Sequence, residues 1–163
     1  MAQRFYNDPA GFGVGYPVIG ANSISFSEAD PVYVNTSGFL ALGTTSDKVL
    51  GFSVDTISAL ASDNQTVAKV CPKYTYHDAQ LVVYPLASST AATQTMIGEY
   101  AVISGTTSGS FTLNATTSAT VGQFFIVGIN PNNNGSTTAG TTAELSEVVV
   151  RVAFPQTWTA TSS

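Results

Sequence analysis

The chain has 163 residues, of which 44% are hydrophobic and only 9% are charged. That length corresponds to one domain with a single packed core, and the hydrophobic content excludes a disordered polyelectrolyte. The chain has five Lys and Arg and ten Asp and Glu, a net charge of −5. So few cations exclude a protein that binds the phosphates of nucleic acids, and the negative charge disfavours binding to anionic membranes.

The first 22 residues differ in composition from the rest of the chain. Their glycines and prolines, among them Pro9 and Pro17, predict no regular element. Their aromatic side chains are unusual for a disordered tail. We therefore expect residues 1–22 to be an extended arm and residues 23–163 to be the body. The residues expected to dock this arm on the body or on a neighbouring molecule are Phe5, Tyr6, Phe12 and Tyr16.

The body is predicted to consist of short strands separated by turns. Gly and Pro interrupt most of it, and apolar residues recur at every second position in segments rich in Val, Thr, Phe and Tyr. Long helices are therefore not expected. The shorter predicted strands are residues 31–34, 39–42, 49–55, 65–70, 80–84, 100–103 and 110–113.

Two further strands have the clearest patterns. In residues 148–154, three valines and Phe154 share one face and Arg151 lies on the other. Residues 124–129 are apolar on both faces, which predicts a central strand that is covered on each side or lies at an interface.

The segments between the strands contain recognisable turns. Residues 35–38 and 106–109 each end in glycine and predict hairpin turns in which Gly38 and Gly109 take positive φ. Residues 56–62 and 88–96 lack alternation and allow a helical turn. Residues 130–140 predict an exposed loop. Eight to ten short strands favour an all-β, single-domain β-sandwich or β-barrel, jelly-roll-like, with an extended N-terminal arm.

The sequence offers little for catalysis. A nucleophilic triad requires a histidine, and His77 is the only one; Cys71 lies six residues earlier. We favour a packed cysteine and a loop histidine, and expect no enzymatic activity. The run Gly11 to Gly15 follows no predicted strand, and it lacks the lysine of a phosphate-binding loop.

Binding chemistry is also sparse. Zinc requires several His and Cys ligands, which the chain lacks. Glu28 and Asp30 would share a strand face, but no calcium-loop motif is present, and we expect neither a metal nor a cofactor. Four Asn-x-Ser/Thr triplets, at Asn35, Asn64, Asn114 and Asn134, are expected by chance in so Ser/Thr-rich a chain. An aromatic platform for carbohydrate would draw on Trp158, Tyr74, Tyr76 and Tyr84. We instead expect Tyr84 to pack in the body, and the alternative for Trp158 is to anchor the C-terminal strand extension.

The N-terminus lacks the apolar core of a secretory signal, and no stretch approaches 18 apolar residues. Cys71 has no second cysteine for an internal disulfide. These features predict a soluble protein made in the cytoplasm.

Residues 1–85 contain a Gly/Pro-rich arm, then Ala29-Asp30-Pro31-Val32-Tyr33-Val34, the turn to Gly38-Phe39-Leu40, and Val49-Leu50-Gly51-Phe52-Ser53-Val54. In these features residues 1–85 resemble the head decoration, or cement, proteins of tailed bacteriophages. The resemblance implies a small β-barrel or sandwich on the outer capsid surface, often as a trimer. Its partners would be the major capsid protein and copies of itself.

The resemblance also implies a location in the virion and a structural role, namely stabilising the assembled shell. Deleting residues 1–20 is then expected to leave a folded body that no longer saturates capsids. The alternatives are a β-sandwich carbohydrate-binding or adhesion module, and a virion fibre or tail subunit of similar composition.

Overall fold

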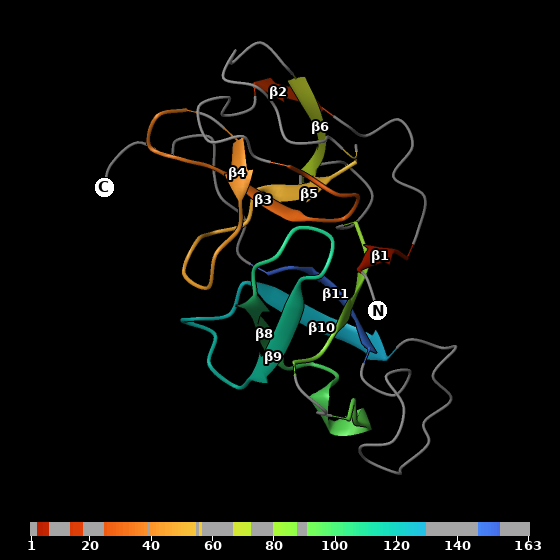
Figure 1. Cartoon of the computed structure of the whole chain (residues 1–163). Coiled ribbons are helices and arrows are strands. Elements are labelled where there is room, and N and C mark those ends of the chain that lie inside the picture. The colour runs from red at the N-terminus through yellow and green to blue at the C-terminus, as the bar shows by residue number, and fades with distance from the viewer. Residues whose placement is uncertain are drawn as a thin grey trace.

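The computed structural model describes residues 3–6, 14–17, 25–38, 40–54, 56, 67–72, 80–87, 91–129 and 147–153, with the backbone alone described at 14–17 and 67–72. These residues form two antiparallel sheets (Figure 1). The six-stranded sheet contains, in spatial order, β1 (Arg4–Phe5), β7 (Val82–Pro85), β11 (Glu147–Val152), β10 (Phe124–Ile129), β8 (Tyr100–Gly105) and β9 (Thr112–Thr116). The five-stranded sheet contains β2 (Val14–Pro17), β6 (Val67–Pro72), β5 (Gly51–Ser53), β3 (Pro31–Val34) and β4 (Leu40–Leu42).

The predicted all-β fold is confirmed. Each sheet has two open edges in the described part of the chain, β1 and β9 in one and β2 and β4 in the other, so neither closes into a barrel. The arrangement is that of a β-sandwich.

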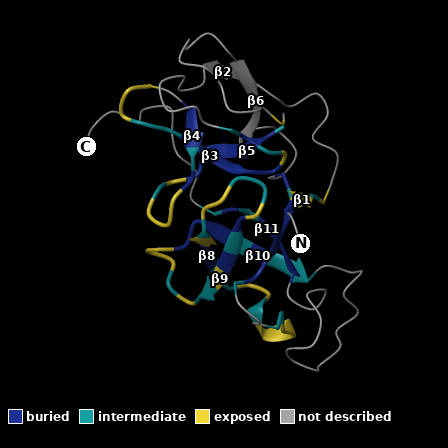
Figure 2. Ribbon diagram, viewed as in Figure 1, coloured by how far each residue is buried: buried dark blue, intermediate teal, exposed yellow. Residues whose placement is uncertain are grey.

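The core lies between the sheets and follows from strand alternation. In β11, Val148, Val150 and Val152 are buried on the inner face, as their spacing predicts. Strand β10 lies inside its sheet between β11 and β8, which confirms its central place. Figure 2 shows the buried residues concentrated in the strands and most exposed ones in the connections.

Three aromatic rings join the two sheets. Phe52 of β5 stacks on Phe124 of β10, with ring centroids 6.0 Å apart, and Tyr84 of β7 lies 5.7 Å from Phe124. All three side chains are buried. The Tyr84 hydroxyl donates a 2.6 Å hydrogen bond to the carbonyl of Ala29, so its polar end is satisfied inside the core. Burial raises the pKa of Tyr84 well above its usual value, and the charge of Asp30 adds to the rise.

Both predicted hairpin turns are present. Gly38 (φ 83°) closes the β3–β4 turn, where its N–H donates to the Asn35 carbonyl at 2.9 Å. Gly109 (φ 76°) closes the β8–β9 turn. A 3₁₀ turn at Gln94–Met96 lies within the region expected to allow a helical turn. Residues 57–62, the loop at 130–140 and Phe154 lie outside the described residues.

The prediction that residues 1–20 contain no regular element is wrong. Strand β1 pairs with β7, and β2 pairs with β6, so the arm contributes an edge strand to each sheet. The sequences of both edge strands are compatible with these positions. Strand β1 needs only two residues, and Pro17, which has no N–H to donate, ends a strand at a sheet edge, where proline is tolerated. The predicted boundary at residue 22 lies outside the described part.

Candidate binding surface

The four arm residues expected to bind a partner have different settings. Phe5 is half-buried and packs against the hydrophobic core of its own chain. Tyr6 is 50% exposed, and its N–H donates to the Leu81 carbonyl at 2.9 Å, so its position is fixed. Tyr16 lies in β2, where only the backbone is described, and Phe12 is outside the described residues. Of the two aromatic arm side chains that are described, Phe5 and Tyr6, Tyr6 is the one exposed to a partner.

A buried polar cluster fixes the start of the arm. Asp30 is fully buried. One carboxylate oxygen accepts hydrogen bonds from the Gln3 amide and the Gly109 N–H (2.9 Å). The other accepts from the Ser27 N–H (2.8 Å) and the Ser108 hydroxyl (2.6 Å). This carboxylate therefore connects the chain start, the turn before β3 and the β8–β9 turn.

Gln3 extends the same cluster, because its side-chain oxygen accepts the N–H of Phe111 at 3.0 Å. Burial raises the pKa of Asp30 above its usual range, and the hydrogen bonds from Ser108, Gly109, Ser27 and Gln3 oppose that rise. Glu28 lies exposed in a turn. The prediction that it shares a strand face with Asp30 is therefore wrong. The Asp30 carboxylate is occupied by protein donors and serves as a structural anchor.

An ion pair fixes β1 from the outer face of the six-stranded sheet. Both guanidinium nitrogens of Arg4 donate to Glu147, at 2.9 and 2.7 Å. The Glu147 side chain is 1% exposed, whereas that of Arg4 is 45% exposed. The hydrogen bond to Glu147 raises the pKa of Arg4, although burial opposes this. A paired, two-pronged contact of this kind is specific in geometry.

The outer face of the same sheet also carries a row of four residues across four strands. Phe125 pairs in register with Tyr100 on one side and with Arg151 on the other, and Tyr100 pairs with Thr116. We call these four residues the outer row. The neighbouring residues of the same strands, among them Phe124 and Val152, are buried between the sheets. The outer row therefore points away from the core.

Three side chains of the outer row are linked by contacts through Phe125. The rings of Tyr100 and Phe125 meet edge to face with centroids 5.6 Å apart. The Arg151 guanidinium carbon lies 5.2 Å from the centre of the Phe125 ring, within the range of a cation–π contact. All four residues are half-buried. The outer row thus combines two aromatic rings, two hydroxyls and a cation on one fixed surface.

Gly122 holds the outer row in place. A Cβ at this position would lie 2.6 Å from the Tyr100 Cβ and 2.8 Å from its Cγ and Cδ1. The Tyr100 ring therefore packs directly on the backbone of residue 122.

Replacing Gly122 with alanine is expected to lower the free energy of unfolding by about 1–3 kcal/mol, because Tyr100 must move. Urea unfolding of Gly122→Ala would measure this. Gly128→Ala is the matched control in the same sheet, because its Cβ would meet nothing nearer than 4.0 Å. Equal stability of the two variants would contradict the tight contact.

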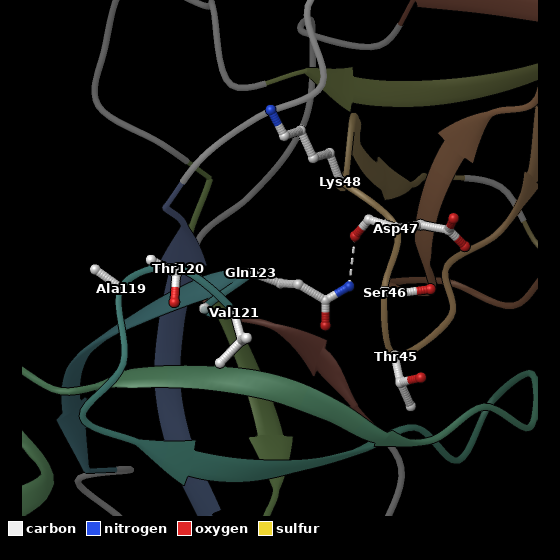
Figure 3. A pocket seen from close by; sticks show the side chains of 9 residues that line it. Thr45, Ser46, Asp47, Lys48, Ala119, Thr120, Val121 and Gln123 are labelled. Carbon is white, nitrogen blue, oxygen red and sulfur yellow. Dashed lines mark hydrogen bonds between the residues drawn. The ribbon is translucent and has the colours of Figure 1, made fainter. Parts of the chain in front are cut away.

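A hollow of about 430 Å³ lies beside the outer row, between the β4–β5 and β9–β10 connections. Thr45 and Ser46 lie on one side and Thr120 and Val121 on the other, with Gln123 between them (Figure 3). The Gln123 amide donates to the carbonyls of Thr44 and Asp47 at 2.8 and 2.5 Å, and its oxygen accepts the N–H of Ile103 at 2.8 Å. Gln123 therefore uses its polar atoms to join the two sheets.

The other residues considered from sequence stay apart from this surface. Tyr84 is buried in the core, as expected from the sequence, and cannot serve as a carbohydrate platform. Asn35 and Asn114 lie in the β3–β4 turn and in β9. Cys71 is in β6, with no side chain described. The remaining candidates lie outside the described residues: Asn64, Tyr74, Tyr76, His77, Asn134 and Trp158.

Within the described ranges, no group of three or more His, Cys, Asp or Glu side chains could hold a metal ion. Over the same residues, no helix has the length and hydropathy needed to cross a bilayer.

Sequence reasoning missed the outer row and the Asp30 cluster. Arg151 was placed correctly on the face opposite the valines. However, its alignment with Phe125 and Tyr100 depends on the register between strands, for which the sequence has no local signal. Comparisons of the chain with protein-family models, with curated proteins and with solved structures find no match.

Proposed function

We propose that this chain is a structural virion protein that binds the outer surface of an assembled capsid and stabilises the shell. The observation that carries the proposal is the outer row, a fixed surface on the six-stranded sheet. Its tyrosine, phenylalanine and arginine are residue types enriched where proteins contact one another. The resemblance of residues 1–85 to decoration proteins supplies the kind of partner.

The mechanism is mechanical. A protein that binds the assembled lattice, and not the separated subunits, raises the free energy of disassembly by mass action. The bound protein must then stay folded when force acts on the shell. The ring contact between Phe52 and Phe124 and the Gln123 hydrogen bonds, which join the two sheets, suit that task. The same proposal includes that three copies of this chain assemble into a trimer.

The proposal is tested by sedimenting purified protein with mature capsids of the virus that encodes it. We expect saturation at a fixed ratio to the major capsid protein, and a higher temperature of shell disruption at saturation. Light scattering of the free protein would show whether a trimer exists before binding. Absence of binding to capsids at micromolar protein would refute the proposal.

Tyr6→Ala tests the part of the arm that the structure leaves accessible. Tyr6 is half-exposed and held by its backbone, so we expect capsid affinity to fall about 5- to 30-fold, as at interface tyrosines. Stability should change by less than about 0.5 kcal/mol. Ile97→Ala is the control, since Ile97 is 40% exposed but lies at the end of the 3₁₀ turn. Equal binding of Tyr6→Ala and wild type would remove Tyr6 from the interface.

A further inference from the structure

We infer that Arg151, held by Phe125 and Tyr100, is the point at which the outer row receives a carboxylate side chain from the capsid surface. This inference rests on the proposed function, and it names the chemistry of the partner. It starts from a contrast between the two described arginines of the six-stranded sheet.

Arg4 and Arg151 lie on the same outer face but have different partners. Arg4 is neutralised by two hydrogen bonds to the buried Glu147. Arg151 contacts the Phe125 ring, and no carboxylate in the described ranges forms an ion pair with it. In a chain with ten acidic and five basic residues, such a half-buried cation is a specific feature of this surface.

The geometry around Arg151 favours a planar acceptor. The Phe125 ring lies 5.2 Å from the guanidinium carbon, and the edge of Tyr100 supports that ring from the next strand. Stacking on an aromatic ring leaves the N–H groups at the rim of the guanidinium for a ligand, and their fork matches the two oxygens of a carboxylate. The row is already rigid, so little side-chain freedom is lost on binding.

The charge of the whole chain distinguishes between classes of acidic partner. With a net charge of −5, the protein repels polyanions at long range, which disfavours an acidic polysaccharide. A single Asp or Glu on a protein surface meets Arg151 beside the uncharged groups of Phe125, Tyr100 and Thr116. A protein carboxylate is therefore the occupant that fits.

The test compares capsid binding by two variants that lose the same charge. Arg151→Gln removes the guanidinium of the outer row, and Lys48→Gln removes an exposed cation at the neighbouring hollow. We expect Arg151→Gln to weaken co-sedimentation with capsids at least 10-fold and to reduce its salt dependence. Lys48→Gln should stay within about twofold of wild type, as expected for a charge outside the contact. Equal losses in the two variants would overturn the inference and leave the proposed function standing.

A third variant keeps the test valid if Arg151→Gln folds poorly. Arg151→Lys retains the charge but loses the planar fork, and we expect it to bind capsids 3- to 10-fold more weakly than wild type at an unchanged melting temperature. Wild-type affinity in Arg151→Lys would overturn the two-pronged contact between a planar guanidinium and a carboxylate. Binding of wild-type protein to polygalacturonate, lost in Arg151→Gln, would overturn the choice of a protein partner. Failure of the wild type to bind capsids would overturn the proposed function itself.

Discussion

Deletion of residues 1–6 is expected to destabilise the whole sandwich, not merely to release an arm. The deletion removes the guanidinium that pairs with the buried Glu147 carboxylate, and loss of one partner from a buried ion pair costs about 3–5 kcal/mol. It also removes the Gln3 amide that bonds Asp30 and the Phe111 N–H. Because whole domains are stable by only about 5–15 kcal/mol, the truncated chain should lose a large share of its free energy of unfolding.

Thermal and urea unfolding would measure this effect. Arg4→Ala isolates the ion pair and should cost about 2–4 kcal/mol, less than the loss from a fully buried pair, because the Arg4 side chain is 45% exposed. Tyr6→Ala, which alters the same segment without removing a buried contact, is the control. A truncated protein with the melting temperature of the full chain would contradict this account. We therefore no longer expect the body to fold without residues 1–20. The point variant Tyr6→Ala, and not deletion of the arm, tests whether this segment binds capsids.

Asp30→Ala is expected to destabilise the protein strongly. It leaves four donors, from Gln3, Ser27, Ser108 and Gly109, without their carboxylate. A buried donor without a partner costs about 1–3 kcal/mol, so a total loss of about 3–5 kcal/mol is expected after local rearrangement. Asp30→Asn should recover little, because its NH₂ group would face two of the donors.

The control for Asp30 is Asp47→Asn. Asp47 also accepts hydrogen bonds from a nearby turn, the N–H and hydroxyl of Thr44 at 3.1 and 2.5 Å, but these bonds are exposed. Its substitution should cost less than about 1 kcal/mol, because water replaces the lost contacts. If urea unfolding showed similar losses for Asp30→Asn and Asp47→Asn, the Asp30 cluster would not be the anchor described above.

Much of the fold follows from local sequence. The alternation of Val148, Val150 and Val152 identified β11 and its buried face, and Gly38 and Gly109 marked two hairpins. Such signals work because a strand has a period of two and a tight turn requires positive φ. They depend on neighbours in sequence, so they were available without the structure.

The remaining features depend on partners that are distant in sequence. Arg4 and Glu147 are 143 positions apart, and Gln3 and Phe111 are 108 apart. Strand β1 has only two residues, too few for any alternation to be visible. The outer row needs the register of β8, β10 and β11 together. A single sequence contains no signal for these pairings, which are set by how the sheets close over the core.

The contacts of β1 also bear on the kinetics of folding. Strand β1 pairs with β7, whereas the ion-pair partner of Arg4, Glu147, begins the last described strand. The Arg4–Glu147 contact joins residues 143 positions apart, so it forms only after a long segment of chain has been brought back to the N-terminal edge. Contacts over such long sequence separations slow folding.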